Sequence, residues 1–335
     1  MRIAVDGMGG DNAPSVVVEG VAQVLKSLPG IQITLVGTEK AMTPFLKKFK
    51  ILKHPQLTIV HTEQVVNMDD PSTVAIRSKK DSSITVAATL VSEGKADAVV
   101  SAGHTGAAVA ATKIKMKMLP GVDRPAIAII MPATHGPFIL LDAGANIDCK
   151  PIHLAQFAVM GEAFARLAFS ALRPRIGLLS VGEEDIKGND LTKESFKILA
   201  DMPLNFIGNV EGSTLFNKVA DVVVCDGFVG NILLKATEGM ARASMWWLKE
   251  ALSKNPIRKT GAILMKSAFK ELKEIGDAEE YGGARLLGVN GIVIIGHGSS
   301  SPRAIKNAIR VADESVKFGI NQHITDGIAE AGIGV

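Results

Sequence analysis

Apolar runs that end in small, polar turns and lead into helical patterns constrain this chain more than any other feature. The seven turns begin at Asp6, Ser101, Asp142, Gly182, Gly208, Asp226 and Gly296. Strands that alternate with helices are typical of a mostly parallel sheet with helices on both faces, and so predict a three-layer α/β/α sandwich. Because the carboxyl ends of parallel strands share one edge, we expect the turns to meet there and form a ligand site.

The apolar runs predict ten strands, and the periodic segments predict eight helices. The strands are expected at residues 3–5, 31–36, 57–61, 98–101, 126–131, 138–141, 176–181, 206–212, 222–225 and 292–295. The helices are expected at residues 14–25, 84–92, from 105 onward, 151–169, 190–200, 232–254, 256–274 and 302–318. Since no repeat or linker divides the chain, we expect one α/β domain over residues 1–335, with a helical pair protruding at residues 242–273.

Composition excludes several classes of protein. With 335 residues, 47% of them hydrophobic, the chain can bury a large core. Only 4% of the residues are aromatic and the net charge is +3, which does not fit a nucleic-acid surface. Two cysteines form no disulfide framework and indicate a reducing compartment. The early acid Asp6 argues against a signal peptide, and no apolar run is long enough to span a membrane.

The segment at residues 98–107 predicts an anion site. Its apolar run ends at Ser101, and Gly103 and His104 lead into Thr105, Gly106 and an alanine-rich helical pattern. Small residues let a ligand approach the backbone, and free amides at a helix N-terminus attract an anion. The alternative is an ordinary turn between strand and helix that binds nothing. The other six turns, expected at the same edge of the sheet, favour the anion site over the ordinary turn.

Motifs for cofactors and metals are absent. The chain has no P-loop and no G-x-S-x-G elbow, its only partial dinucleotide motif begins at Gly296, and its histidines form no H-x-x-x-H pair. We therefore expect neither a cofactor nor a metal. Cys225 follows a strand beside Asp226 and can be read as a nucleophile, but a small buried apolar residue is the favoured interpretation.

Several polar side chains at the turns can serve acyl or phosphoryl chemistry. Lys187 is the only cation in residues 182–190, where it either holds a phosphate or forms a salt bridge with Glu183 or Glu184. Asn146, Asn209 and Asn231 tolerate left-handed turns, and their amides can also donate to an oxyanion. His297 either donates to a carbonyl oxygen or bonds to its own turn.

Residues 242–273, here called the basic arm, differ chemically from the rest of the chain. They contain eight Lys or Arg and two Glu, a net charge of +6, interleaved with Trp246, Trp247 and other apolar residues. A basic amphipathic helix pair suits an acidic protein partner or an anionic membrane surface. The alternative is a solvated face over a dimer core. The cations expected to contact a partner are Lys249, Lys254, Arg258, Lys259 and Lys266.

Taken in order, these motifs resemble the bacterial phosphate acyltransferase family of phospholipid synthesis, which makes acyl phosphate from acyl-acyl carrier protein and inorganic phosphate. The matching segments are residues 5–14, 101–107, 141–146, 182–188, 208–212, 226–231, 281–288 and 297–298. The chain has His104 and Ser180 where the family usually has Asn, and Arg285 where Pro is common. The substitution at position 104 lies inside the predicted anion loop.

The resemblance implies a fold like that of isocitrate and isopropylmalate dehydrogenases, a homodimer, and a cytoplasmic location at the inner face of the membrane. It implies acyl carrier protein and inorganic phosphate as partners, no metal or nucleotide, and a product that a glycerol-3-phosphate acyltransferase uses on the way to phosphatidic acid. The implied substrate-binding residues are Asp6, Gly10, Asp11, Ser101, Gly103, His104, Thr105, Gly106, Asn146, Asn209 and Asp226.

We expect the 101–107 loop and Lys187 to hold phosphate, and Asn231 to position phosphate or donate to the oxyanion, with His297 a second candidate for that donor. Two alternatives come from other classes. A decarboxylating dehydrogenase of this fold would need Mg²⁺ carboxylates and an arginine cluster; Asp221 and Asp226 are close in sequence, but no arginine cluster lies beside them. The other alternative is a non-catalytic adaptor for a carrier protein or membrane.

Overall fold

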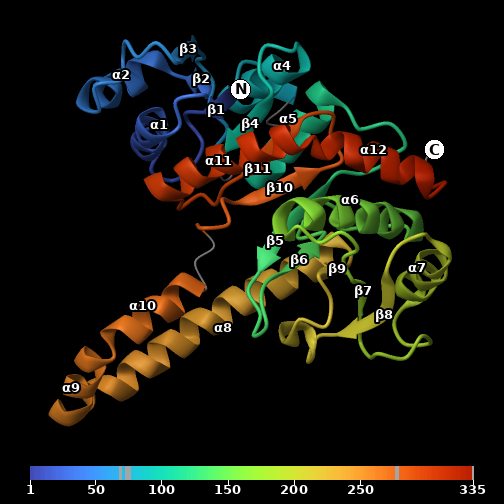
Figure 1. The fold of residues 1–335 in the computed structure, drawn as a ribbon. Coiled ribbons are helices and arrows are strands. Elements are labelled where there is room, and N and C mark those ends of the chain that lie inside the picture. Colours follow the sequence, from blue (N-terminus) through green and yellow to red (C-terminus); the bar gives the residue numbers. More distant parts are fainter. Residues whose placement is uncertain (68–69, 72–76, 276–278, 334–335) are drawn as a thin grey trace.

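A computed structural model describes residues 1–67, 70–71, 77–275 and 279–333. In this part of the chain, one sheet contains eleven strands (Figure 1). In sheet order the strands are β3 (Leu57–His61), β2 (Gln32–Gly37), β1 (Arg2–Asp6), β4 (Ala98–Ser101), β11 (Ile292–Ile295), β10 (Ala284–Leu287), β5 (Ala126–Met131), β6 (Phe138–Leu141), β9 (Val222–Val224), β7 (Ile176–Ser180) and β8 (Phe206–Glu211).

Strand direction changes in the middle of the sheet. Strands β3, β2, β1, β4 and β11 are parallel, and so are β6, β9, β7 and β8. Between these groups, β10 is antiparallel to β11 and to β5, and β5 is antiparallel to β6. The mostly parallel sheet is confirmed. The prediction of one common edge is wrong, because three successive antiparallel pairings, β11–β10, β10–β5 and β5–β6, make the two parallel groups run in opposite directions.

Helices cover both faces of the sheet. They are α1 (Ser15–Ser27), α2 (Glu39–Lys48), α4 (Ser83–Ser92), α5 (Thr105–Met116), α6 (Pro151–Phe169), α7 (Asp190–Asp201), α8 (Gly227–Ser253), α9 (Pro256–Leu264), α10 (Lys266–Ile275), α11 (Pro302–Phe318) and α12 (Ile320–Glu330), with a 3-10 turn at Leu215–Asn217. Helices α1, α2, α6, α11 and α12 share one apolar cluster, while α4 and α5 pack into another. The three-layer sandwich is thus confirmed.

Close packing of α1 on α11 depends on a glycine. A Cβ atom at Gly20 would lie 2.6 Å from the Cβ atom of Ile305, so any larger residue would push the two helices apart. The core below them is fully apolar, with Val18, Ile33 and Ile309 enclosed. Tight burial of this kind fixes β1 and β4, whose carboxyl ends support the first turns of the candidate site.

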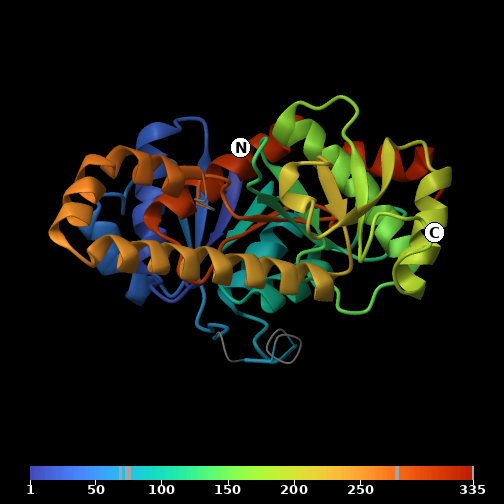
Figure 2. The same cartoon turned by 90° about the horizontal axis from the view of Figure 1, so that it is seen from below.

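The basic arm extends from the body as a hairpin of helices. Figures 1 and 2 show α8 running away from β9, with α9 at its far tip and α10 turning back. The break falls at Asn255, whose Oδ1 accepts from the amide of Arg258 at 2.9 Å and caps α9. The predicted single helix at 256–274 is in fact two, because α9 ends at Leu264 and α10 begins at Lys266. Among the described residues, no helix has the length and apolar character needed to cross a membrane.

Candidate functional site

The first candidate site is a hollow at the carboxyl ends of β1 and β4, here called the Asp6 pocket. Its lining residues are Asp6, Met8, Gly9, Val66, Ser83, Ile84, Ser101, Gly103, His104 and Ala107. The pocket therefore combines the predicted loop after β4 with the turn after β1 and the beginnings of α4 and α5.

A hydrogen-bonded chain at the base of the pocket fixes the loop after β4. The amide of Gly103 donates to Ser101 Oγ at 3.2 Å, and Ser101 Oγ donates to Asp6 Oδ2 at 2.7 Å. Burial raises the pKa of Asp6, while Ser83, Ser101 and the amide of Met8 favour its charged form. Asp6 is thus an enclosed anchor of the loop, and its position suits support of the site better than direct contact with an anion.

Glycines allow the turns after β1, β4 and β11 to touch. A Cβ atom at Gly9 would lie 2.7 Å from the amide nitrogen of Gly103. Gly10 has a φ of +112°, and the amide of the next residue, Asp11, donates to the carbonyl of Gly298 at 2.8 Å. The structure thus brings these three turns together. Gly10 and Gly103 contribute only backbone atoms to these contacts. The side chain of Asp11 is exposed.

His104 caps α5. Its Nδ1 accepts from the amide of Ala107 at 3.2 Å, which is the bond that an asparagine cap would make. A nitrogen that accepts carries no proton, so the neutral ring has its N–H at Nε2, which bonds to no described residue. No described residue accepts from the amides of Thr105 and Gly106 in this first turn. The start of α5 can therefore present several donors to an anion.

His297 has a similar local arrangement on the turn after β11. Its Nδ1 lies 2.8 Å from Ser299 Oγ and accepts from the amide of Ser299 at 3.2 Å. The ring is exposed, and its Nε2 forms no bond with any described residue. This matches the interpretation in which His297 bonds to its own turn, and it leaves one nitrogen available.

A second group of turns follows β6 and β9. Asp142 accepts from the amides of Ile127, Gly144, Ala145 and Asn146 at 2.8–3.0 Å, and from Asn146 Nδ2 at 2.8 Å. Asn146 Nδ2 also donates to the carbonyl of Pro125, so both amide protons are used. Burial raises the pKa of Asp142. Asn146 is therefore a positioning residue, which shapes the loop beside α8.

The start of α8 carries two predicted residues with different roles. Asp226 caps the helix, because its Oδ1 accepts from the amides of Phe228 and Val229 at 2.9 Å. Asn231, one turn later, is exposed, and among the described residues its amide has no hydrogen-bond partner. It lies over Gly144, where a Cβ atom would be 3.2 Å from Asn231 Nδ2. The side-chain amide of Asn231 is thus a hydrogen-bond donor beside Gly144, without a partner among the described residues.

The third group follows β7 and β8. Lys187 is exposed, and among the described residues its ammonium forms no ion pair, so the predicted alternative of a salt bridge with Glu183 or Glu184 is not found. Asn209 Nδ2 donates to the carbonyl of Glu184 at 2.8 Å, while its buried Oδ1 has no partner. Asn209 therefore holds the loop that carries Lys187.

The first two groups share one face of the sheet although their strands run in opposite directions. Ala107 at the start of α5 and Ala143 in the loop after β6 belong to the same apolar cluster, together with Ile127 and Ile295. The starts of α5 and of the loop after β6 therefore pack over the same face of the sheet. The hydrogen bonds of Lys187 and Asn209 stay within the third group.

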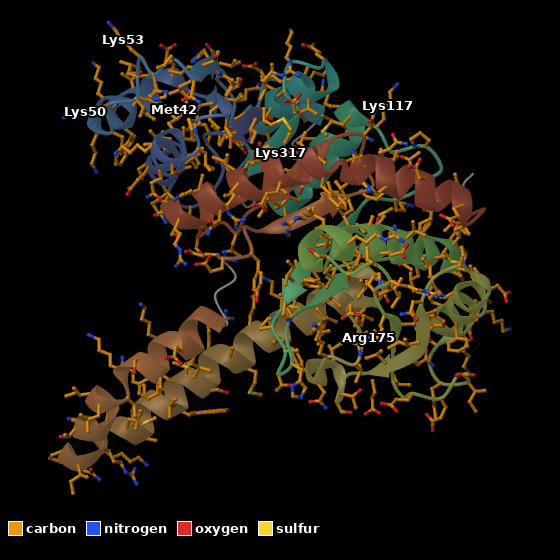
Figure 3. All side chains as sticks on the ribbon, in the orientation of Figure 1. Met42, Lys50, Lys53, Lys117, Arg175 and Lys317 are labelled. Atoms are coloured by element: carbon orange, nitrogen blue, oxygen red, sulfur yellow. The ribbon has the colours of Figure 1, made fainter. Side chains whose placement is uncertain are left out.

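Two other interpretations meet physical obstacles. Burial beside Asp142 and Asp226 raises the pKa of the Cys225 thiol well above its usual value, so the thiol stays protonated and a poor nucleophile. Asp221 pairs with Arg175, which is labelled in Figure 3, through contacts of 3.1 and 3.2 Å. Since that carboxylate is already held by Arg175, it is not free to join Asp226 in a Mg²⁺ site.

Two residues of interest lie outside the predicted set. Ser83 begins α4, lines the pocket and hydrogen-bonds Asp6. A serine pair before a helical pattern predicts only a helix cap, and no feature of the sequence around Ser83 indicates a contact with Asp6. Arg285 was noted only as a departure from the family pattern, and it is buried in the sheet.

Comparisons with known proteins show similar sequences over nearly the whole chain. A family model described as fatty acid synthesis protein matches residues 1–323. The phosphate acyltransferase of Geotalea daltonii is 49% identical over 98% of this chain and 95% of its own, and that of Thermodesulfovibrio yellowstonii is 50% identical over 98% and 94%.

Solved structures share the fold at low sequence identity. A phosphotransacetylase from Streptococcus pyogenes has a TM-score of 0.60 at 19% identity, covering 98% of this chain and 94% of its own. A 4-hydroxythreonine-4-phosphate dehydrogenase from Klebsiella pneumoniae has a TM-score of 0.54 at 14% identity, covering 94% and 98%. The expected dehydrogenase-like architecture is therefore confirmed.

Proposed function

We propose that this chain, which belongs to the fatty acid synthesis protein family, transfers an acyl group from acyl-acyl carrier protein to inorganic phosphate. Its relatives show that it is an acyltransferase. The observation that supports it most is the start of α5, where no described residue accepts from the amides of Thr105 and Gly106, next to a pocket lined by His104 and Ala107. The products would be an acyl phosphate and the free thiol of the carrier.

The proposed chemistry needs no nucleophile from the protein. A phosphate oxygen attacks the thioester carbonyl carbon, the carbon–sulfur bond breaks from the tetrahedral intermediate, and the thiolate takes up a proton. A thiol with a pKa of about 8.5 leaves without strong acid help. Correct orientation lowers the barrier by up to roughly 7–11 kcal/mol, and one oxyanion donor by about 2.7–4 kcal/mol.

We assign the phosphate to the Asp6 pocket. The amides of Thr105 and Gly106, the Thr105 hydroxyl and Nε2 of His104 would donate to its oxygens. Asp6 would act indirectly, by holding Ser101 and hence the loop. Asn231, with its unpaired amide on the same face, is assigned to the oxyanion, and His297 remains the second candidate for that donor.

Lys187 is proposed as a further phosphate ligand; because its turn follows β7, six places from β4 in the sheet, this role requires the third group to approach the Asp6 pocket when phosphate binds. Its replacement by alanine should raise the KM for phosphate by about 10- to 100-fold, because a charge-assisted hydrogen bond is worth about 1.5–3 kcal/mol. Steady-state rates of acyl-phosphate formation at varied phosphate measure this. Lys193→Ala is the matched control, because that exposed lysine lies on the next helix and outside the loop. Near-normal phosphate kinetics in a folded Lys187→Ala protein would remove Lys187 from the site.

The basic arm is proposed to receive the acidic carrier protein and to contact an anionic membrane surface. Its five proposed contact cations are exposed, as are Trp246 (62%), Ile257 (85%) and Leu264 (80%). Exposed apolar side chains of this size, gathered on one element, favour an interaction surface. The same surface allows peripheral association without a spanning helix.

Charge reversal on the arm tests the carrier proposal. Arg258→Glu with Lys259→Glu should raise the KM for acyl carrier protein about tenfold at low salt, since steering by opposite charge is lost. The difference from the wild type should shrink as salt is added. Lys47→Glu with Lys48→Glu makes the same charge change on α2 and should leave KM unaltered. Equal KM values for the arm variant and the wild type would reject docking on the arm.

We further propose that the chain acts as a homodimer and that its acyl phosphate is consumed by a glycerol-3-phosphate acyltransferase on the route to membrane phospholipid. One incubation separates the reaction from its alternatives. With acyl carrier protein, acyl donor and phosphate, an acyltransferase yields acyl phosphate and free carrier thiol in equal amounts. A dehydrogenase would instead change the absorbance of NAD with a hydroxydicarboxylate, and an adaptor would do neither.

A further inference from the structure

Arg285 is a buried cation without a compensating charge. It lies on β10 with 6% of its surface exposed, and among the described residues its guanidinium forms no hydrogen bond or ion pair. Its Cζ stacks 4.3 Å from the ring centroid of Phe164 on α6. Burial lowers the pKa of Arg285 to about 10, which still leaves it protonated at neutral pH. A buried, unpaired charge is costly, so a native chain that keeps one calls for a partner.

A shallow hollow opens beside this guanidinium, on the other face of the sheet from the Asp6 pocket. It is lined mainly by apolar residues of β10, β11 and α12, with Ser315 and Asn321 as its other polar side chains. Both of these are already engaged: Ser315 Oγ donates to the carbonyl of Val311, and Asn321 Nδ2 donates to the carbonyl of Val289. The guanidinium of Arg285 therefore supplies this hollow with N–H donors that have no partner among the described residues.

The charged groups around Arg285 indicate the charge of the ligand that would neutralise it. Arg310 and Glu314 on α11 are the charged groups that influence Arg285, and they pair with each other at 2.7 Å. The local excess is thus one positive charge. A guanidinium presents a planar fork of N–H donors that matches a carboxylate. The apolar walls suit a monoanion with a short hydrocarbon part better than a phosphate dianion.

We propose that this hollow, lined by residues of β10, β11, α11 and α12, binds a small carboxylate anion held by the guanidinium of Arg285. The site is separate from acyl transfer, and its tests need no turnover. The anion would supply the hydrogen-bond acceptors and the negative charge that the described residues do not.

Thermal unfolding of the full chain tests the site. Sodium acetate or butyrate replaces sodium chloride at constant pH and ionic strength. Wild type should show a saturable rise in Tm, about 4 °C at a hundred times the Kd for a chain of 335 residues. Arg285→Met should abolish the rise and should itself unfold at a higher temperature than anion-free wild type, because it removes the buried charge. Arg166→Met is the control, since Arg166 is on the surface and pairs with Glu162, and it should keep the carboxylate response.

Saturation-transfer NMR on the butyrate methyl protons provides a second readout. Wild type should give a signal that Arg285→Met reduces at least tenfold, while Arg285→Lys, which keeps the charge, should retain part of it. Equal carboxylate responses in wild type and Arg285→Met, or no saturable response in wild type, would overturn the site. A larger Tm rise with phosphate than with carboxylates would overturn the ligand class. A change in oligomeric state without a carboxylate response would show that a second copy covers Arg285, and would also overturn the proposal.

Discussion

Asn231→Ala should lower kcat for acyl-phosphate formation by about 10²- to 10³-fold, which is the usual cost of removing one oxyanion donor. Asn231 is exposed on the first turn of α8, and its amide is unpaired among the described residues. Loss of this side chain should therefore leave the fold intact. Because the oxyanion exists only in the transition state, kcat should fall while the KM values for phosphate and acyl carrier protein change little.

Two further variants separate this role from a structural one. Asn231→Asp keeps the shape of the side chain but loses its N–H donor, and it should lower kcat at least as much as Asn231→Ala. Lys235→Ala removes an exposed side chain one turn further along α8 and should retain full activity. If Asn231→Ala instead raises KM for phosphate at constant kcat, Asn231 binds phosphate in the ground state and is not the oxyanion donor.

Thr105→Pro should raise the KM for phosphate by about 10- to 100-fold, because it removes one backbone N–H that the anion would use. Thr105 is the first residue of α5, where proline is well tolerated. The preceding residue, His104, has an extended backbone with φ −63° and ψ 110°, as a residue before proline requires. The substitution thus deletes an amide proton and preserves the helix.

Thr105→Ala is the matched control for this experiment, since it removes the hydroxyl and keeps the amide. A small effect of alanine beside a large effect of proline assigns phosphate binding to the backbone. Equal, large losses would assign it to the hydroxyl. Normal phosphate kinetics in a folded Thr105→Pro protein would place the phosphate elsewhere than at α5.

The apolar runs located most strands, but they did not reveal strand direction. β10 was missed because it is only four residues long and contains Arg285, so it looks polar beside the Tyr281–Gly283 turn. Periodicity also does not distinguish a hairpin from a crossover. Two hairpins and the antiparallel pairing of β10 with β5 together reverse the strand direction at the centre of the sheet. The grouping of all strand ends on one edge failed for this reason alone.

The sequence indicated which residue types gather at the turns, but it did not indicate which of their atoms are free. Asn146 and Asn231 look equivalent in the chain. Asn146 donates both amide protons, to Asp142 and to the carbonyl of Pro125, whereas the amide of Asn231 has no partner among the described residues. Lys187 likewise looked able to pair with Glu183 or Glu184. Only tertiary geometry decides these cases, because partners and burial depend on how distant turns meet.

The most direct test of the proposed reaction measures phosphate dependence and stoichiometry together. Purified protein is mixed with acyl-acyl carrier protein and ¹⁸O-labelled phosphate, and acyl phosphate, free carrier thiol and protein mass are followed. We expect one ¹⁸O-labelled acyl phosphate for each thiol released, no thiol release without phosphate, and no acyl group on the protein. Thiol release without phosphate, or an acylated protein that turns over, would contradict direct attack by phosphate.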